Sequence, residues 1–158
     1  MAEGNITRAR EVYMTLVRML DDRDWKYERH DKDLLIKSGI RGDDLPVEYL
    51  MIVNSRTEVV QFISSMPFKM PEDKRVDGAL AVCVANFGLV NGSFDYDLSD
   101  GEIRFRLTTS YYGNDVSADV LEHMMIVAAS TVDNYNDKFF MLSKGVITLQ
   151  QFIEQENS

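Results

Sequence analysis

Cysteine is almost absent from this sequence, and its scarcity excludes a disulfide framework. Cys83 is the only cysteine among 158 residues, and it stands inside the apolar run from Ala79 to Ala85. A single thiol can form neither an internal disulfide nor a cysteine-rich metal site. Because free cysteine is among the most buried residue types, we expect Cys83 to lie in the core.

Long apolar runs are also missing. No stretch of the chain approaches the roughly eighteen apolar residues that are needed to span a bilayer. The first residues, MAEGNITRAREVYM, carry charges where a secretory signal requires a continuous apolar segment. We therefore expect an unexported, cytoplasmic protein with no membrane partner.

Positive charge is in short supply. Lys and Arg number 17 against 26 Asp and Glu, which leaves a formal net charge of −9. The basic residues are scattered from Arg8 to Lys144, mostly beside acids, as is typical of solvated faces. Because a chain of this charge repels the phosphate backbone, we expect no nucleic-acid partner.

Residues that carry chemistry are few. His30 and His123 are the only histidines, and neither has the H-E-x-x-H neighbour that a zinc site requires. Gly88, Gly92 and Gly101 match neither phosphate-binding glycine motif. An enzyme needs a nucleophile with a base, a metal or converging carboxylates. We therefore expect no enzyme, no catalytic residue, no metal site and no cofactor.

One acidic segment invites comparison with a calcium site. Asp95, Asp97 and Asp100 alternate ahead of Gly101, as acids do in an EF-hand loop. The glycine comes one residue too late for that loop, and interleaved apolar residues such as Phe94 are typical of a strand. We interpret the segment as a β-hairpin, and a weak cation site on these three acids stays open as the alternative.

Composition and patterning indicate one α+β domain over residues 1–158. Apolar residues make up 45% and charged residues 27%, as in ordinary globular proteins, and a chain of this length buries one core. Asn5 caps a first helix that runs to about Leu20. Strand patterns then cover residues 25–37, 48–53 and 57–63, with turns at 40–46 and 54–56.

A break and a second helix are expected next. Pro67 and Pro71 cannot continue a central strand, and Pro71 followed by two acids opens a helix that runs to about Phe87. One apolar side of this helix is expected to face the sheet, namely Val76, Leu80, Cys83, Val84 and Phe87. The opposite side is nearly free of charge and too apolar for water, and it holds Ala79, Ala81, Val82 and Ala85.

This excess of apolar surface predicts an interface. We expect a homodimer or another protein partner to be contacted through Ala79, Val82, Ala85 and Asn86, with Met124 of the long helix beside them. The alternative is that the core wraps around the second helix.

A tight hairpin and two more helices complete the expected fold. Asp100-Gly101 supplies a two-residue turn. The pairs expected from that turn are Leu98–Ile103, Tyr96–Phe105 and Phe94–Leu107 on an apolar face, and Asp97–Arg104 and Asp95–Arg106 on a solvent face. Ser117 starts a long helix that ends at Lys144-Gly145. A capping box of Thr148 and Gln151 starts a short amphipathic helix.

Five segments are distinctive: the apolar strands 49–53 and 59–63, the proline-marked connection 67–71, and the segments 85–89 and 92–106. Together with the order helix, antiparallel strands, helix, hairpin, long helix, they give the chain a resemblance to the YbjN domain family, whose fold is that of class I type III secretion chaperones. The resemblance implies an antiparallel sheet with helices packed on it, in a small acidic homodimer that recognises other proteins.

The resulting hypothesis is a non-enzymatic protein-interaction module of chaperone-like or regulatory type, whose partners are a second copy and an unidentified protein. The alternative hypothesis is a small-ligand sensor domain that binds a metabolite between the helices and the sheet.

Overall fold

The protein folds as four α-helices and six strands in the part of the chain that the computed structural model describes, residues 5–41 and 45–158. The helices are α1 (Ile6–Asp22), α2 (Arg75–Gly88), α3 (Ala118–Ser143) and α4 (Leu149–Asn157), and a short 3₁₀ helix, η1 (Glu72–Lys74), precedes α2. The strands are β1 (Glu28–His30), β2 (Leu35–Arg41), β3 (Pro46–Asn54), β4 (Val59–Lys69), β5 (Ser93–Tyr96) and β6 (Glu102–Ser110). The expected α+β class is confirmed.

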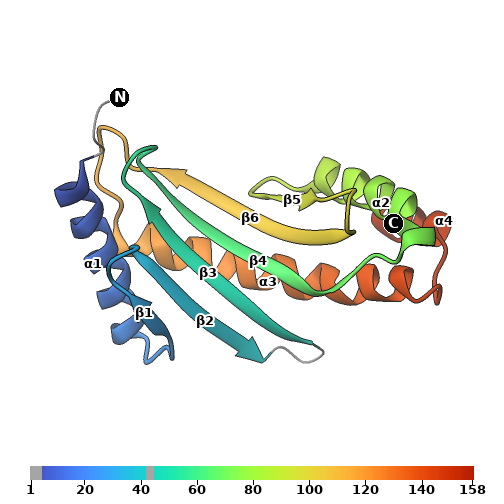
Figure 1. Ribbon diagram of the computed structural model, residues 1–158, viewed down its shortest axis with the longest axis horizontal. Helices are drawn as coiled ribbons and strands as arrows, with labels where there is room; N and C mark the ends of the chain where they lie inside the picture. Colours follow the sequence, from blue (N-terminus) through green and yellow to red (C-terminus); the bar gives the residue numbers. More distant parts are fainter. Residues whose placement is uncertain (1–4, 42–44) are drawn as a thin grey trace.

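The strands form one antiparallel sheet in the order β1-β2-β3-β4-β6-β5. Figure 1 shows α3 passing behind the sheet, with α1 at one end and α2 and α4 at the other, while β2, β3 and β4 are unobstructed from the front. One face of the sheet is therefore covered by helices, and the front of these three strands is not.

The core lies between the helices and the covered face. Along β3 the residues Val47, Tyr49, Met51 and Val53 are buried, and Leu50 between them is only half-buried. Successive side chains of a strand point to opposite faces. The apolar residues of β3 are therefore divided between the core and the uncovered face of the sheet.

The first helix is confirmed, and the strand expected after it is corrected. Asn5 caps α1 by accepting a hydrogen bond from the Arg8 N–H at 3.1 Å. Residues 25–37 do not form one strand, because a tight turn separates β1 from β2 and Leu34 there has a φ of +50°. Ile40 belongs to β2, so the turn expected from residue 40 begins too early, and its residues 42–44 lie outside the described part.

Pro67 lies within β4, so the expectation that it ends the strand was wrong. The β4–β6 register shifts between Ser65 and Lys69, and the pairing of β4 with β3 extends from Val59 only to Ile63. Because Pro67 falls in this irregular stretch, its missing N–H costs the sheet no regular ladder bond.

The hairpin forms, but its register is two residues away from the expected one. Phe94 pairs with Phe105, and Tyr96 pairs with Ile103. The loop is longer than two residues, because the Gly101 N–H donates to the Asp97 carbonyl at 2.8 Å and the Asp97 side chain accepts from the Ser99 N–H. A side-chain turn at the loop start thus competes with the tight turn that Asp-Gly favours.

Both C-terminal helices begin as expected. Ser117 caps α3, and Thr148 and Gln151 form the capping box of α4. Buried apolar residues flank each cap, namely Val116 and Leu121 at α3 and Ile147 and Phe152 at α4. Among the described residues, no helix combines the length and the apolar character that crossing a membrane requires.

Candidate functional site

Helix α2 is fixed to β5 through its smallest residues. Its buried residues are Gly78, Ala81, Val82 and Ala85. A Cβ on Gly78 would lie 2.7 Å from both the Tyr96 hydroxyl oxygen and Met70 Cγ, so any larger residue would require these side chains to shift. The small side of α2 is therefore its inner side.

Two polar side chains hold this contact. The Asn86 side chain bonds the main chain of Phe94 twice, with Nδ2 donating to the carbonyl at 2.9 Å and Oδ1 accepting from the N–H at 2.7 Å. The Tyr96 hydroxyl donates to the Arg75 carbonyl at 2.7 Å. These bonds set the rotation of α2 about its axis.

The orientation of α2 is thus the reverse of the one expected. Val76 is 69% exposed, Leu80 48% and Phe87 96%, and Cys83 is exposed rather than buried. Both sides of the helix are apolar, so periodicity could not tell which side would pack. The side with glycine and alanine is the one that packs, because only small side chains allow the helix to come close to the rest of the protein.

The residues expected at an interaction surface lie mostly inside the protomer. Val82, Ala85 and Met124 are buried, and Ala79 and Asn86 are half-buried. Helix α2 instead presents what we call the outer α2 face, made of Val76, Leu80, Cys83 and Phe87.

The outer α2 face lacks charge. After Asp77, no residue as far as Gly88 is ionised at neutral pH. Val76, Leu80, Cys83 and Phe87 recur at intervals of three or four residues and so form one stripe. Exposed apolar stripes of this kind are typical of interaction surfaces.

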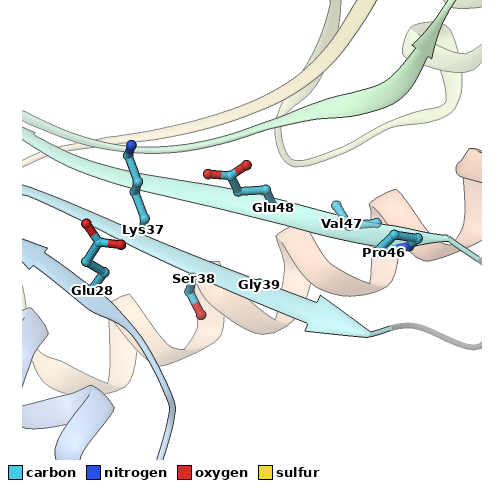
Figure 2. A pocket seen from close by; sticks show the side chains of 7 residues that line it. All are labelled: Glu28, Lys37, Ser38, Gly39, Pro46, Val47 and Glu48. Carbon is cyan, nitrogen blue, oxygen red and sulfur yellow. The ribbon is translucent and has the colours of Figure 1, made fainter.

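A second feature is a groove on the uncovered side of the sheet, which we call the sheet groove. It consists of two adjoining hollows of about 550 and 400 Å³ that share Lys37, Pro46 and Glu48. Figure 2 shows Lys37 and Glu48 on one side of neighbouring strands and Ser38 pointing to the other side of β2. Leu50 and Ile63, which are cross-strand partners, line the second hollow.

The sheet groove reaches an incomplete edge of the sheet. Strand β1 pairs with β2 only from Leu35 to Lys37. The Val53 N–H of β3 donates to the Leu34 carbonyl. The main-chain groups of successive residues in an antiparallel strand point alternately to its two sides. Those of Gly39, five positions after Leu34, therefore point away from β3 and toward the incomplete edge. Gly39 is exposed, and a Cβ there would meet only the Val47 carbonyl oxygen, at 3.9 Å. No contact with the described residues, 5–41 and 45–158, requires a glycine at this position.

The acids of the hairpin are engaged by neighbouring side chains. Asp95 pairs with Arg104 at 3.0 Å and with Arg106 at 3.1 Å. Hydrogen bonds from Ser99 lower the pKa of Asp97, and the Lys69 ammonium lowers the pKa of Asp100. In residues 5–41 and 45–158, no three His, Cys, Asp or Glu side chains gather where they could hold a metal ion.

The two histidines lie apart. His30 contacts Glu28 at 2.8 Å on β1. His123 lines a hollow of about 330 Å³ between β6 and α3, together with Thr108, Val120 and Val127. Neither contact resembles the base and nucleophile pair that covalent catalysis requires.

Comparison with known proteins begins with a family match. Residues 14–141 match the sequence model of the YbjN family, whose description reads "Putative bacterial sensory transduction regulator". A search of curated proteins found no match.

Solved structures provide the second comparison. The chain resembles YbjN from E. coli, described as "a putative transcription regulator", with a TM-score of 0.60 and 10% identity over 77% of this chain and 86% of that one. It also resembles a chain of the HopA1–SchA chaperone–effector complex (TM-score 0.53, 12% identity, 81% and 95% covered) and one of the ExsC–ExsE complex (0.55, 9%, 80% and 92%). At these identities the likeness shows a shared fold, which confirms the expected secretion chaperone-like architecture.

Proposed function

The chain belongs to the YbjN family, and from this premise we propose that it is a non-enzymatic protein-binding module of regulatory or chaperone-like type that acts as a homodimer. The observation that carries the proposal is the exposed, charge-free outer α2 face. The fold shared with chains of two protein complexes, one of them a chaperone–effector complex, supports it.

A second copy is the occupant we propose for the outer α2 face. Two chains of net charge −9 repel each other, so they can approach best where charge is lacking. Val76 and Phe87 are 11 positions apart, or about 16 Å along the helix. Two such helices packed antiparallel would place Leu80 and Cys83 near the twofold axis and Phe87 of each against Val76 of the other.

The test is the mass of the full chain in solution. We expect wild type at micromolar concentration to show about twice the protomer mass of 18.1 kDa, and the double variant Leu80→Glu, Phe87→Glu to be monomeric. Tyr112→Glu, at a 76% exposed position in the β6–α3 loop, is the matched control and should remain dimeric. A monomeric wild type, or a dimeric double variant, would refute the interface.

For the protein partner we propose an extended segment bound in the sheet groove. The incomplete edge at Gly39 offers main-chain groups to an added strand, and the half-buried Leu50 and Ile63 offer apolar contact. Glycine inside a strand weakens it, and it often marks the close approach of another backbone.

A peptide probe tests the groove separately from the dimer. We expect a labelled peptide of alternating Val and Lys to bind wild type, and its N-methylated counterpart, which cannot donate main-chain hydrogen bonds, to bind far less. Gly39→Val should abolish binding without loss of thermal stability, because valine favours strands. Equal binding by both peptides would exclude strand addition.

The small-ligand alternative is favoured by one observation, the hollow between β6 and α3 that contains His123. A ligand bound there would raise the melting temperature by mass action. A metabolite panel that gives a shift in wild type and none in His123→Ala would support this function over the first.

We also propose a cytoplasmic location. Cys83 is an exposed free thiol, and such thiols persist in reducing compartments. The test is to trap the native thiol in intact cells with a membrane-permeant alkylating agent. A Cys83 thiol that is already oxidised would contradict this location.

A further inference from the structure

Helix α4 packs against α2 and α3, and one aromatic side chain anchors it in the core. Phe152 is the only residue of this helix that is buried, and its exposed fraction is 0%. Its ring stacks on Phe139 of α3 with centroids 5.4 Å apart. Phe139 in turn meets Phe94 edge-on at 5.1 Å, so Phe152 fills the outer end of an aromatic cluster.

A polar contact lies one helical turn further on. The Glu156 carboxylate accepts a hydrogen bond from the Tyr135 hydroxyl at 2.6 Å and pairs with the Lys138 ammonium at 2.9 Å. Its side chain is only 11% exposed. Residues four apart share one face of a helix, so Phe152 and Glu156 together define what this surface recognises: an aromatic ring and a carboxylate at that spacing.

Helix α4 is too short to be stable in isolation. It has nine residues, whereas isolated helices shorter than about 12 residues are marginal in water. It is joined to α3 by residues 144–148, where Gly145 adopts a φ of +70°. The helical form of this segment therefore depends on the surface beneath it.

The residues beneath α4 lie within the family match, and α4 lies beyond it. The family match covers residues 14–141, which include Phe94, Tyr135, Lys138 and Phe139. Helix α4 begins at Leu149, beyond that match. The surface is thus built by matched residues and is filled by a segment beyond the match.

We propose that this surface, formed by Phe94, Tyr135, Lys138 and Phe139, is a docking groove for an amphipathic helix of a protein partner, and that α4 occupies it in cis until the partner displaces it. The partner helix carries an aromatic residue and, four positions later, a carboxylate. Its residues are not those of the outer α2 face or of the sheet groove, so its test is distinct from the tests of the proposed function.

The experiment uses the full chain and, as the probe, a labelled peptide with the sequence of residues 146–158. Phe152→Ala removes the buried ring and should free the groove. Glu154→Gln is the matched control, because Glu154 is exposed and its hydrogen-bond partner among the described residues is Gln150 of the same helix. We expect the peptide to bind Phe152→Ala about tenfold or more tightly than wild type or Glu154→Gln, since α4 competes in those two chains.

Changes in the peptide test the chemistry of recognition. A peptide with Ala in place of Phe152 should not bind, and one with Gln in place of Glu156 should bind more weakly. Equal binding to all three chains, or no binding to a Phe152→Ala chain that circular dichroism shows to be folded, would overturn the proposal.

Hydrogen exchange on wild type keeps the proposal testable if Phe152→Ala does not fold. We expect the α4 amides to exchange faster than those of α3, and added peptide to accelerate exchange in α4 alone. Protection of α4 equal to that of α3 and unaffected by peptide would overturn the proposal. The proposal would also be overturned if wild type were a dimer and Phe152→Ala a monomer, because the groove would then be occupied by α4 of a second copy.

Discussion

The hydroxyl of Tyr13 on α1 donates a hydrogen bond to the Asp31 carboxylate at 2.8 Å, which ties the first helix to the turn between β1 and β2. Tyr13 is 2% exposed, and Arg29 pairs with the same carboxylate at 2.9 Å. Burial, together with the hydrogen bond to Asp31, raises the pKa of Tyr13 to about 12.

The first prediction concerns alkaline stability. Because the pKa of Tyr13 is higher in the folded chain than in the unfolded chain, its contribution is complete below the unfolded pKa of about 10 and is lost as pH rises through about 12. Tyr13→Phe removes this contribution, so its free energy of unfolding should fall less steeply over that pH range. Burial also raises the pKa of Tyr49 and Tyr135, so some dependence remains. Urea unfolding at several pH values measures the free energy of unfolding of wild type and of Tyr13→Phe. If this free energy falls equally steeply with pH in both chains, the role of Tyr13 is contradicted.

The second prediction concerns the attachment of α2. Asn86→Ala removes both side-chain bonds to Phe94 and leaves the N–H and the carbonyl of this buried residue without those partners. We expect a loss of about 2 to 3 kcal/mol in the free energy of unfolding. Asn91→Ala, at an exposed asparagine, should change it by less than about 0.5 kcal/mol. Equal effects of the two variants in chemical denaturation would show that Asn86 does not hold the helix.

The third prediction compares two glycines. Gly101 has a φ of +80°, and a Cβ there would lie 2.3 Å from the Met70 carbonyl oxygen. Gly101→Ala should therefore destabilise the fold by about 2 kcal/mol or more. Gly88 lies at the end of α2 with nothing within 4 Å of its Cβ position. Gly88→Ala should be neutral or stabilising by up to about 1 kcal/mol. Melting temperatures rank the two variants, and the reverse order would contradict this account of the hairpin loop.

The fourth prediction concerns Cys83. Because its side chain is exposed, the native chain at high dilution should react with one equivalent of a water-soluble thiol reagent without denaturant. If the outer α2 face joins two copies, the rate should fall as the protein concentration rises into the dimeric range. A thiol that reacts only after unfolding at every concentration would place Cys83 in the core.

Much of the fold follows from local signals in the sequence. The caps at Asn5, Ser117 and Thr148 lie where their side chains predict, because a cap bonds N–H groups only three residues away. The hairpin also forms where Asp100-Gly101 indicates, although its register differs by two residues because the side chain of Asp97 makes a longer loop. Position along the chain was therefore predicted better than pairing.

The sequence by itself determined the class of the fold, the order of its elements and the presence of surplus apolar surface on α2, since these depend on composition and on contacts between near neighbours. Only the tertiary structure decided which side of α2 packs, because both sides are apolar and close approach to β5 at Gly78 selects one. It likewise decided that β4 passes through Pro67, where a register shift with a distant strand tolerates the missing N–H. Contacts between residues far apart in sequence depend on shape complementarity, which no periodicity along the chain encodes.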